Sequence, residues 1–530
     1  MTRATVDLTG TSVLTRFIVR RDRVRIVVWI GSIAALVAVT TASIKGLYPT
    51  QADLDLAAVA SKGNAAAIAF NGPAQGLDTV GGQVAFQAGA TGLVVVALMS
   101  MLMIGRLTRG EEEAGRLELV RSLAVGGAAP TVAASMVVFV MDLAVGALVA
   151  GTLLAEGLSV AGSIAFGVSF TLLGLVFACV ALVAAQISEN TRVVYGIAGA
   201  VLGASYVLRA VGDIGDGTVS WLSPIGWVQK TRPFAGERWW PFLPTIGAAA
   251  SLLVVAEVLA ARRDLGGGLV APRPGPRTAS AALGSPLGLA VRLQRGSVIG
   301  WGAGVLLTAV AYGSIANSID DFVRNNKTLA EMFAGGGASL TEWYLATSMR
   351  ILALVGAGFV IQSTLRIRGE ETQLHAEPVL ATPVSRRRWA MSHLFVAAGG
   401  SVVLLAIAGL AVGISYGLVG GGIHVVPGLV GDALVYIPAM WLMVGLTFAL
   451  IGLVPRGVVA AWAFVAFCFI IGLLGGVLGL PRWLMDLSPF DQVPQLPAAH
   501  FAVLPLIVIT VIAGGLGMAG LAGLRRRDIG

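Results

Sequence analysis

The feature that most constrains this chain is a series of twelve apolar runs, each long enough to form a helix across the roughly 30 Å hydrocarbon layer of a membrane. Only 12% of the 530 residues are charged, whereas soluble domains average about 25%. Apolar residues reach 56%, which is more apolar surface than a soluble fold can hide from water. The sequence therefore predicts an all-α polytopic membrane protein of about twelve transmembrane helices. The expected helices lie near residues 24–45, 86–106, 129–155, 162–187, 191–212, 242–261, 299–319, 345–366, 389–417, 428–453, 457–479 and 500–523.

The positive residues indicate how these helices are oriented. The chain has 36 Lys and Arg and a formal net charge of +8. If the N-terminus lies inside, 26 of the 36 fall in segments on the inner side, as expected from the retention of positive residues in the cytoplasm. The sequence therefore predicts cytoplasmic N- and C-termini. This distribution also explains the basic charge without any nucleic-acid partner.

An internal repeat divides the chain into two halves. The sequence Arg-Gly-Glu-Glu at 109–112 recurs at 368–371, an offset of 259 residues, and follows the second apolar run each time. Because each half has six expected spans, the two copies share one orientation, as in parallel repeats related by an axis along the membrane normal. We expect a first six-helix half over 1–261 and a second over 299–530. Between them, 262–298 is basic and rich in Gly and Pro, which predicts a cytoplasmic linker.

The loop that follows the second apolar run of each half carries the most informative residues. In the first half, the acidic run 111–113 opens a stretch with apolar residues at helical spacing, which predicts a short interfacial helix. In the second half, the acids at 370–371 lead to Glu377 and then to Leu-Ala-Thr-Pro-Val-Ser-Arg at 380–386. This segment resembles the corresponding loop of the ABC-2 family of exporter permeases, which typically has the same ending. The first copy departs from it, with Ala-Val-Gly-Gly at 124–127.

The resemblance implies an ABC-2, or type V exporter-like, fold in which each loop forms a coupling helix docked on a separate ATP-hydrolysing subunit. It implies two copies of that subunit, which bind ATP and Mg, and an amphipathic or hydrophobic cargo such as antibiotics or lipids. The fused form looks like the membrane subunit of actinobacterial tetronasin-type antibiotic and multidrug exporters, in the bacterial plasma membrane. The candidate coupling residues are Glu111, Glu112, Glu118, Glu370, Glu371, Glu377, Thr382, Pro383 and Arg386.

A plainer interpretation of the acidic runs is a solvated, helix-capping charge cluster, which is what most charge runs are. The recurrence of the same four residues at one offset favours partner docking over capping alone.

The segments expected outside the membrane carry a second duplicated motif. Leu-Ser-Pro occurs at 222–224 and again at 487–489, between the fifth and sixth spans of each half. By resemblance this region forms short re-entrant or extracellular helices that cap the translocation path, and proline would break the element where the chain turns. The residues 48–83 are expected to form an extracellular loop. Ser223, Pro224, Ser488 and Pro489 are therefore candidates for an extracellular gate.

The same outer segment of the first half is rich in tryptophan and in positive residues. Tryptophans at this depth normally form the aromatic belt at the membrane interface, and that is the favoured interpretation. The residues are Trp221, Trp227, Trp239, Trp240, Lys230, Arg232 and Arg238.

One acid lies in the middle of an expected span. Asp142 occupies the centre of 129–155, where a carboxylate is costly unless it is paired or hydrated, so it should face the interior of the bundle. Two interpretations remain open: a position on the substrate path, or a protonated carboxyl group hydrogen-bonded between helices.

The chain carries no nucleotide-binding loop. A P-loop needs a lysine directly after a glycine, and none of the lysines follows one. Energy must come from a partner subunit or from an ion gradient, so a gradient-driven twelve-span drug transporter is the alternative. The characteristic motif of major facilitator carriers fails, since Arg109 stands where their Asp should be. The 2 Cys and 4 His show no ligand spacing, so we expect no enzyme activity, metal site or cofactor in this chain.

Overall fold

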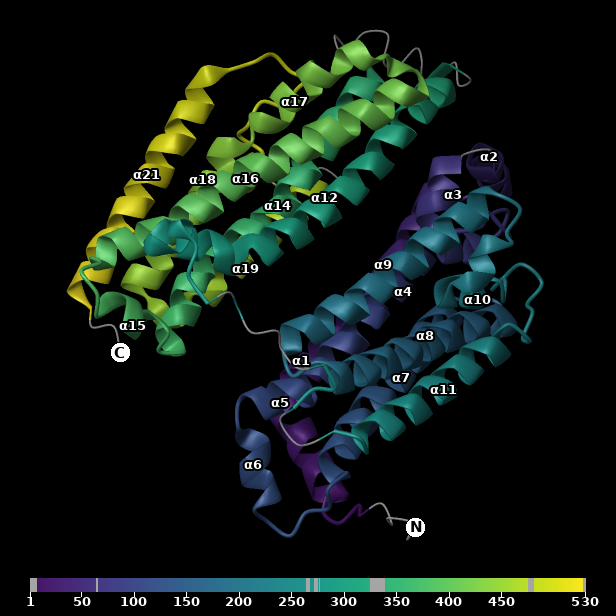
Figure 1. The fold of residues 1–530 in the computed structure, drawn as a ribbon. Coiled ribbons are helices and arrows are strands. Elements are labelled where there is room, and N and C mark those ends of the chain that lie inside the picture. The colour runs from purple at the N-terminus through teal and green to yellow at the C-terminus, as the bar shows by residue number, and fades with distance from the viewer. Residues whose placement is uncertain are drawn as a thin grey trace. The chain divides into compact units, whose positions relative to one another are not determined.

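The computed structural model shows an all-helical, multi-pass membrane protein (Figure 1). Eleven helices in the described part of the chain are long and apolar enough to span a membrane, and that part contains no strand. The chain divides into two compact units, Met1–Pro274 and Gly275–Gly530. The structure describes residues 7–62, 65–263, 267–270, 275, 277–324, 339–474 and 481–527.

Six membrane-length helices build the first unit. They are α1 (Thr11–Leu47), α4 (Val80–Leu107), α7 (Ala129–Ala155), α8 (Val160–Ile187), α9 (Thr191–Ile214) and α11 (Phe242–Ala260). In their most apolar stretches, α4 is 72% buried and α8 is 67% buried, whereas α1 and α11 are each 17% buried. A helix that is apolar on all sides belongs in the interior, and the exposed apolar faces of α1 and α11 suit contact with lipid. The core of this unit therefore lies along α4 and α8.

Short helices close the two ends of the first unit. At one end, which we call the α5 end, α5 (Arg109–Glu113) and α6 (Arg116–Arg121) follow α4 (Figure 1). At the other end, the α10 end, lie α2 (Gln51–Lys62), α3 (Ala65–Asn71) and α10 (Pro224–Gln229) (Figure 1). The expected loop 48–83 thus contains two helices. A short 3-10 helix, η1 (Val219–Leu222), connects α9 to α10.

The second unit repeats this plan with the long helix α14 at its centre, which is 72% buried in its most apolar stretch. Its helices are η2 (Ala281–Gly284), α12 (Pro286–Arg324), α14 (Leu340–Thr372), α15 (Ala376–Leu380), α16 (Arg386–Tyr416), η3 (Gly417–Gly421), η4 (Ile423–Val425), α17 (Val426–Leu434), α18 (Ile437–Leu453), η5 (Pro455–Gly457), α19 (Val459–Leu474), α20 (Arg482–Met485) and α21 (Val503–Arg526).

Small residues bring α18 and α21 into close contact. A Cβ atom at Gly452 would collide with the backbone of Gly520, and one at Gly523 would meet the backbone of Gly452. Glycines at such positions let two helix backbones approach closely, which is how helices associate within a membrane where lipid offers no hydrophobic driving force. Helix α21 is therefore held on α18, although only 17% of its most apolar stretch is buried.

Several expected boundaries differ from the structure; helix α1, for example, begins at Thr11, well before the expected residue 24. Helix α12 begins at Pro286, inside the segment 262–298, where the Ser285 side chain accepts a hydrogen bond from the Gly288 backbone N–H at 3.1 Å and so caps the first turn. The expected span 428–453 is divided into α17 and α18. The expected span 457–479 corresponds to α19, a shorter apolar helix, and its residues 475–479 lie outside the described chain.

Candidate functional site

Glu112 on α5 joins three parts of the first unit. Arg109, one helical turn earlier, donates a hydrogen bond of 2.7 Å to its carboxylate, and Arg263, beyond the end of α11, donates two of 2.8 and 3.0 Å. Both guanidinium groups also bond to the Gly267 carbonyl, at 2.8 and 3.1 Å. Only 7% of the Glu112 side chain is exposed. This carboxylate therefore fastens the loop after α4 to the chain that leaves the last span of the unit.

The two neighbouring acids contact other helices. Glu111 accepts from Arg116 at 2.7 Å and lies 3.1 Å from Arg21 of α1. The hydrogen bond to Glu111 raises the pKa of the Arg116 guanidinium above its ordinary value. Glu113 accepts from the backbone N–H and the hydroxyl of Thr191, at 3.1 and 2.6 Å, at the start of α9. The acidic run thus holds α5 against α1 and α9, and it is not a freely solvated charge cluster.

The second unit places its acids in the same way. Glu371 accepts from Arg368, one turn earlier on α14, at 3.1 Å. Its two carboxylate oxygens also accept from Arg527, the residue after α21, at 2.6 Å each. Glu370 pairs with Arg366 at 2.6 Å. Only 3% of the Glu371 side chain is exposed, so this carboxylate also faces the interior.

The two units therefore share one arrangement, which we call the terminal clasp. It consists of a glutamate, an arginine three residues before it, and a second arginine just beyond the last span of the unit. Glu112 and Glu371 are related by the 259-residue offset of the repeat. A carboxylate between two guanidinium groups at low exposure is strongly held, because removing one partner leaves a charge without compensation. The members are Arg109, Glu112 and Arg263 in the first unit, and Arg368, Glu371 and Arg527 in the second.

Other parts of the two loops face solvent. On α6 the carboxylate of Glu118 is exposed, and Leu119 and Leu123 are 72% and 67% exposed. In the second loop Glu377, Thr382 and Pro383 are exposed. These side chains are therefore accessible to a partner.

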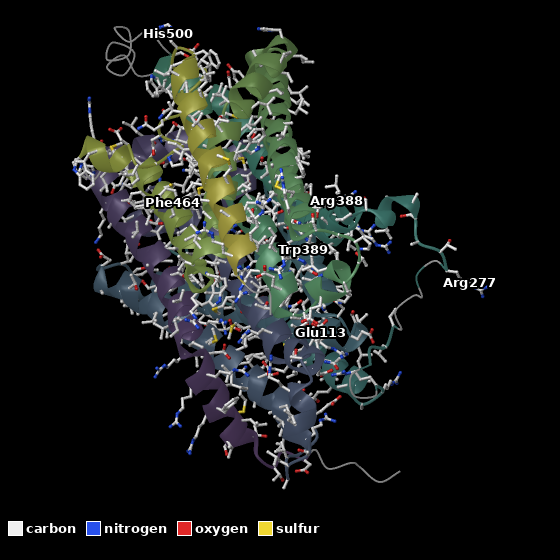
Figure 2. All side chains as sticks on the ribbon, turned by 90° about the vertical axis from the view of Figure 1, so that its left-hand side faces the viewer. Glu113, Arg277, Arg388, Trp389, Phe464 and His500 are labelled. Carbon is white, nitrogen blue, oxygen red and sulfur yellow. The ribbon has the colours of Figure 1, made fainter. Side chains whose placement is uncertain are left out.

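The second loop is anchored by the apolar residues between its exposed ones. Ala376 of α15 is buried in a cluster with Trp389 of α16, while Arg388 is exposed (Figure 2). Ser385 begins α16 by accepting a hydrogen bond from the backbone N–H of Arg388 at 3.2 Å, as N-cap residues do. Arg386, the last residue of the Thr-Pro-Val-Ser-Arg sequence, is exposed and donates to the backbone carbonyl of Arg527 at 3.1 Å. It therefore connects the loop to the terminal clasp.

An acidic residue near the start of α1 was not singled out from the sequence. Asp22 is 1% exposed and lies 2.9 Å from Arg21, 2.5 Å from Arg25 and 3.0 Å from Arg106 of α4. The sequence could have indicated this ion-paired position, because Asp22 is a single acid inside the run Arg-Arg-Asp-Arg. It fixes the start of α1 beside the end of α4, next to Glu111.

Asp142 lies in the interior of the first unit, fully buried on α7. Ser100 of α4 donates a 2.6 Å hydrogen bond to one carboxyl oxygen. Gly174 of α8 lies against the same carboxyl group, where a side chain would collide with it. The other carboxyl oxygen has no hydrogen-bond partner among the described residues. Asp142 thus bridges three core helices.

The two Leu-Ser-Pro copies form different structures. Ser223 caps α10, accepting from the Gly226 backbone N–H at 3.3 Å and donating to the Ser205 carbonyl at 2.6 Å, and Pro224 is the first residue of that helix. Ser488 and Pro489 are buried and lead into a turn. The duplicated motif therefore begins a helix in the first unit only, within the described chain.

Comparisons with known proteins identify relatives of this chain. Residues 283–525 match the family described as "Multidrug efflux system permease Rv1217c, C-terminal domain". Over 525 residues the chain is 40% identical to the multidrug efflux system permease protein Rv1217c of Mycobacterium tuberculosis (strain ATCC 25618 / H37Rv), a match that covers 98% of this chain and 95% of that protein. The match therefore extends through both units, and the chain belongs to the family of that multidrug efflux system permease.

Proposed function

We propose that this chain is the membrane-spanning permease subunit of an ATP-driven ABC exporter. It would move amphipathic or hydrophobic molecules, such as antibiotics, other drugs and lipids, out of the cell. The observation that carries this proposal is the terminal clasp, which recurs in both units and gives each unit an equivalent loop to which a partner could attach. The name of its relative, a multidrug efflux system permease, supports the same cargo class.

Two copies of a separate ATP-binding subunit would dock beneath the loops, one under each. That subunit would bind the ATP and the Mg, since the chain has no P-loop lysine of its own. The partner would meet the exposed residues Glu118, Leu119, Glu377, Thr382 and Pro383. Glu118 and Leu119 lie on α6, Glu377 lies on α15, and Thr382 and Pro383 follow α15. A moving partner would therefore displace the loop that follows a core helix of each unit, α4 or α14.

The candidate coupling acids Glu111, Glu112, Glu370 and Glu371 would have a different part in this process. Their carboxylates are occupied by arginines of the same unit, so they would hold the loops in place and would not bind the partner themselves. The terminal clasp would then transmit a displacement of each loop to the last span of its unit.

The proposed organisation keeps two six-helix halves, 1–261 and 299–530, joined through the basic segment 262–298. Both termini and both loops would lie in the cytoplasm, and the protein would reside in the bacterial plasma membrane. Support for this orientation comes from the arginines that gather at the α5 end of the first unit, including Arg21, Arg25 and Arg106. The gate candidates Ser223, Pro224, Ser488 and Pro489 would lie on the outer side.

The alternative, a gradient-driven drug transporter, has one observation in its favour. Asp142 is a buried carboxyl group in the core of the first unit, and such groups carry protons in many carriers. In the exporter it would instead join α4, α7 and α8 or contact the substrate path.

Reconstitution separates the two proposals. The full chain is purified under mild conditions, and the proteins that accompany it are identified. The chain alone and the chain with its co-purified proteins are then placed in separate vesicles loaded with a fluorescent drug. We expect drug movement only with a co-purified ATPase and ATP, and no response to a proton gradient. Transport by the chain alone, driven by a proton gradient, would contradict the exporter and support the carrier.

Docking is tested by charge reversal on the exposed acids. The double variant Glu118→Lys/Glu377→Lys should lose its ATPase partner during purification, while the membrane part keeps its thermal stability. Asp55→Lys is the matched control, because this exposed acid lies on α2 at the α10 end. If the double variant retains a fully coupled ATPase, these residues are not the docking surface.

A further inference from the structure

An open pocket lies at the α5 end of the first unit, where α1, α4 and α9 meet the short helices α5 and α6. Its volume is about 350 Å³, within the range of about 300–1,000 Å³ that is usual for small-molecule sites. The lining is basic and aromatic, because it contains Arg25 and Trp29 of α1, Arg106 of α4, Arg116 of α6 and Tyr195 of α9. These residues are distant in sequence, so only the folded unit forms the pocket.

Two of the lining arginines share one carboxylate with a third arginine. Asp22, buried on α1, lies 2.5 Å from Arg25 and 3.0 Å from Arg106, and Arg21 also pairs with it at 2.9 Å. A guanidinium group has several N–H donors, and Arg25 gives one of them to Asp22. Its other N–H groups have no acceptor among the described residues, so they are available to a bound anion.

The other acids near the pocket do not cancel this positive charge. Glu111 lies 2.7 Å from Arg116 but also 3.1 Å from Arg21. Glu113 (Figure 2), which lines the pocket, is held by its two hydrogen bonds from Thr191. The start of α1 adds further positive side chains that are exposed and form no ion pair with a described residue: Arg16, Arg20 and Arg23. The arginines around the pocket therefore outnumber the carboxylates.

The wall of the pocket on α9 is fixed before any ligand arrives. The hydroxyl group of Tyr195 donates a hydrogen bond of 3.2 Å to the backbone carbonyl of Leu102. The ring of Tyr195 lies on Gly105 of α4, where a side chain would collide with it. A site whose side chains are already held loses little conformational freedom when a ligand binds.

An apolar surface leads away from the arginines along α4. Leu102 lines the pocket, and Leu98 and Val95 follow it at helical spacing on the same face. All three side chains are half-buried, so part of each remains accessible. At 1.5 Å per residue, the helix rises by about 16 Å from Arg106 to Val95. This length is close to half of the roughly 30 Å hydrocarbon layer, which is the depth of one leaflet.

We propose that this pocket binds an anionic phospholipid. The phosphate group would lie among Arg25, Arg106 and Arg116, and one acyl chain would follow the apolar face of α4. Trp29 and Tyr195 would lie at the level of the headgroup, where these aromatic residues normally occur. Basic pockets between transmembrane helices suit such headgroups, and the adjoining apolar face favours a lipid over a soluble phosphate ester. This site goes beyond the proposed export function and does not depend on the source of energy.

Native mass spectrometry of the full-length chain in detergent tests the proposal. The chain is freed of lipid and titrated with phosphatidylglycerol, and the lipids bound per chain are counted at each concentration. We expect one lipid to bind most tightly. For Arg25→Gln/Arg116→Gln its affinity should be at least about tenfold weaker, because charge-assisted hydrogen bonds to the phosphate are lost. Unchanged affinity in this variant would overturn the proposal.

The double variant should remain folded, because each acid keeps another partner. Asp22 retains Arg21 and Arg106, and Glu111 retains Arg21. Thermal unfolding of the purified variant checks this expectation.

The matched control is Arg20→Gln/Arg23→Gln, which removes the same charge from exposed positions of α1 outside the pocket. This control should bind phosphatidylglycerol like the unmodified chain. If both double variants bind equally weakly, the lipid is attracted by the basic surface in general, and the pocket is not its site.

Two further ligands are compared on the unmodified chain. Phosphatidylcholine, whose headgroup has no net charge, should bind at least about tenfold more weakly than phosphatidylglycerol. Glycerol 3-phosphate carries the phosphate without acyl chains and should not displace the bound lipid. Equal binding of the two lipids, or displacement by glycerol 3-phosphate, would contradict the assignment of an anionic phospholipid.

Discussion

At the residue scale, the terminal clasp explains why the duplicated acids are glutamates in both halves. Each accepts from an arginine on its own helix and from one beyond the last span, which needs a carboxylate on a side chain long enough to reach between them. The offset of the repeat predicted that Glu112 and Glu371 are equivalent. It did not predict their partners, because Arg263 and Arg527 are distant in sequence and no local pattern connects them to the acids.

We expect Glu112→Gln to lower the free energy of unfolding by about 3 kcal/mol, since it leaves Arg109 buried without its negative partner. Thermal unfolding of the purified chain measures this loss. Glu257→Gln, an exposed glutamate on α11, is the control and should have no effect. In a double-mutant cycle with Arg263→Gln, a coupling energy near zero would show that the clasp does not contribute to stability.

Asp142→Asn should be tolerated, with a stability change below about 1 kcal/mol, because the amide oxygen can still accept the Ser100 hydrogen bond. Asp142→Leu should be clearly less stable, because the wall formed by Gly174 leaves no room for a branched side chain. Drug efflux is measured beside thermal stability. An Asn variant that is stable but inactive would show that the carboxyl group itself has a role in transport.

At the element scale, the spans were the most predictable part of the molecule. The expected helix 129–155 has the bounds of α7, because an apolar run between Pro130 and the glycine-containing turn at Gly157 leaves little choice. The short helices were less predictable. The apolar stretches of α2 and α3 are too short to predict a span, and the sequence analysis expected a loop there. The same Leu-Ser-Pro sequence begins α10 in one unit and a turn in the other. Tertiary contacts, such as the bond from Ser223 to the Ser205 carbonyl, decide between these outcomes.

Ser223→Ala should therefore destabilise the first unit by about 1–2 kcal/mol, from the loss of the α10 cap and of a buried hydrogen bond. Ser488→Ala provides the comparison from the same motif, since the Ser488 hydroxyl is buried without a hydrogen-bond partner in the described chain. The shift in Tm is measured for both variants. Equal shifts would contradict the assignment of Ser223 as a cap.

At the scale of the whole molecule, the sequence predicted the all-helical membrane class and the repeat, and the structure has eleven membrane-length helices in its described part. Two cavities at the α10 end of the first unit could not be predicted from the sequence. Their lining comes from Pro73, Gln75 and the segment around Arg232, which only the folded chain brings together. The composition of a helix predicts whether it lies in lipid or in water, but it does not predict which residues line a cavity.

The orientation of the molecule is open to a labelling test. Cys179 and Cys468 are buried, so the unmodified chain should not react with a membrane-impermeant maleimide. In intact cells Asp216→Cys should be labelled, whereas Glu118→Cys should be labelled only after the membrane is permeabilised, because the two exposed positions lie at opposite ends of the first unit. The reverse pattern would place the loops outside the cell.

The glycine contacts between α18 and α21 have a mechanical consequence. Arg527 directly follows α21 and pairs with Glu371, so a displacement of Glu371 would be transmitted to α21 and to α18, which is closely packed on it. In the first unit, Glu112 is tied to the chain after α11, whose single glycine, Gly247, faces open space and makes no such contact. The second unit would thus transmit a displacement of its loop with little deformation, and the first unit would deform more. If the proposed ATP-binding subunits dock on both loops, they would therefore perform unequal work, and blocking the subunit on one loop would not have the same effect as blocking the subunit on the other.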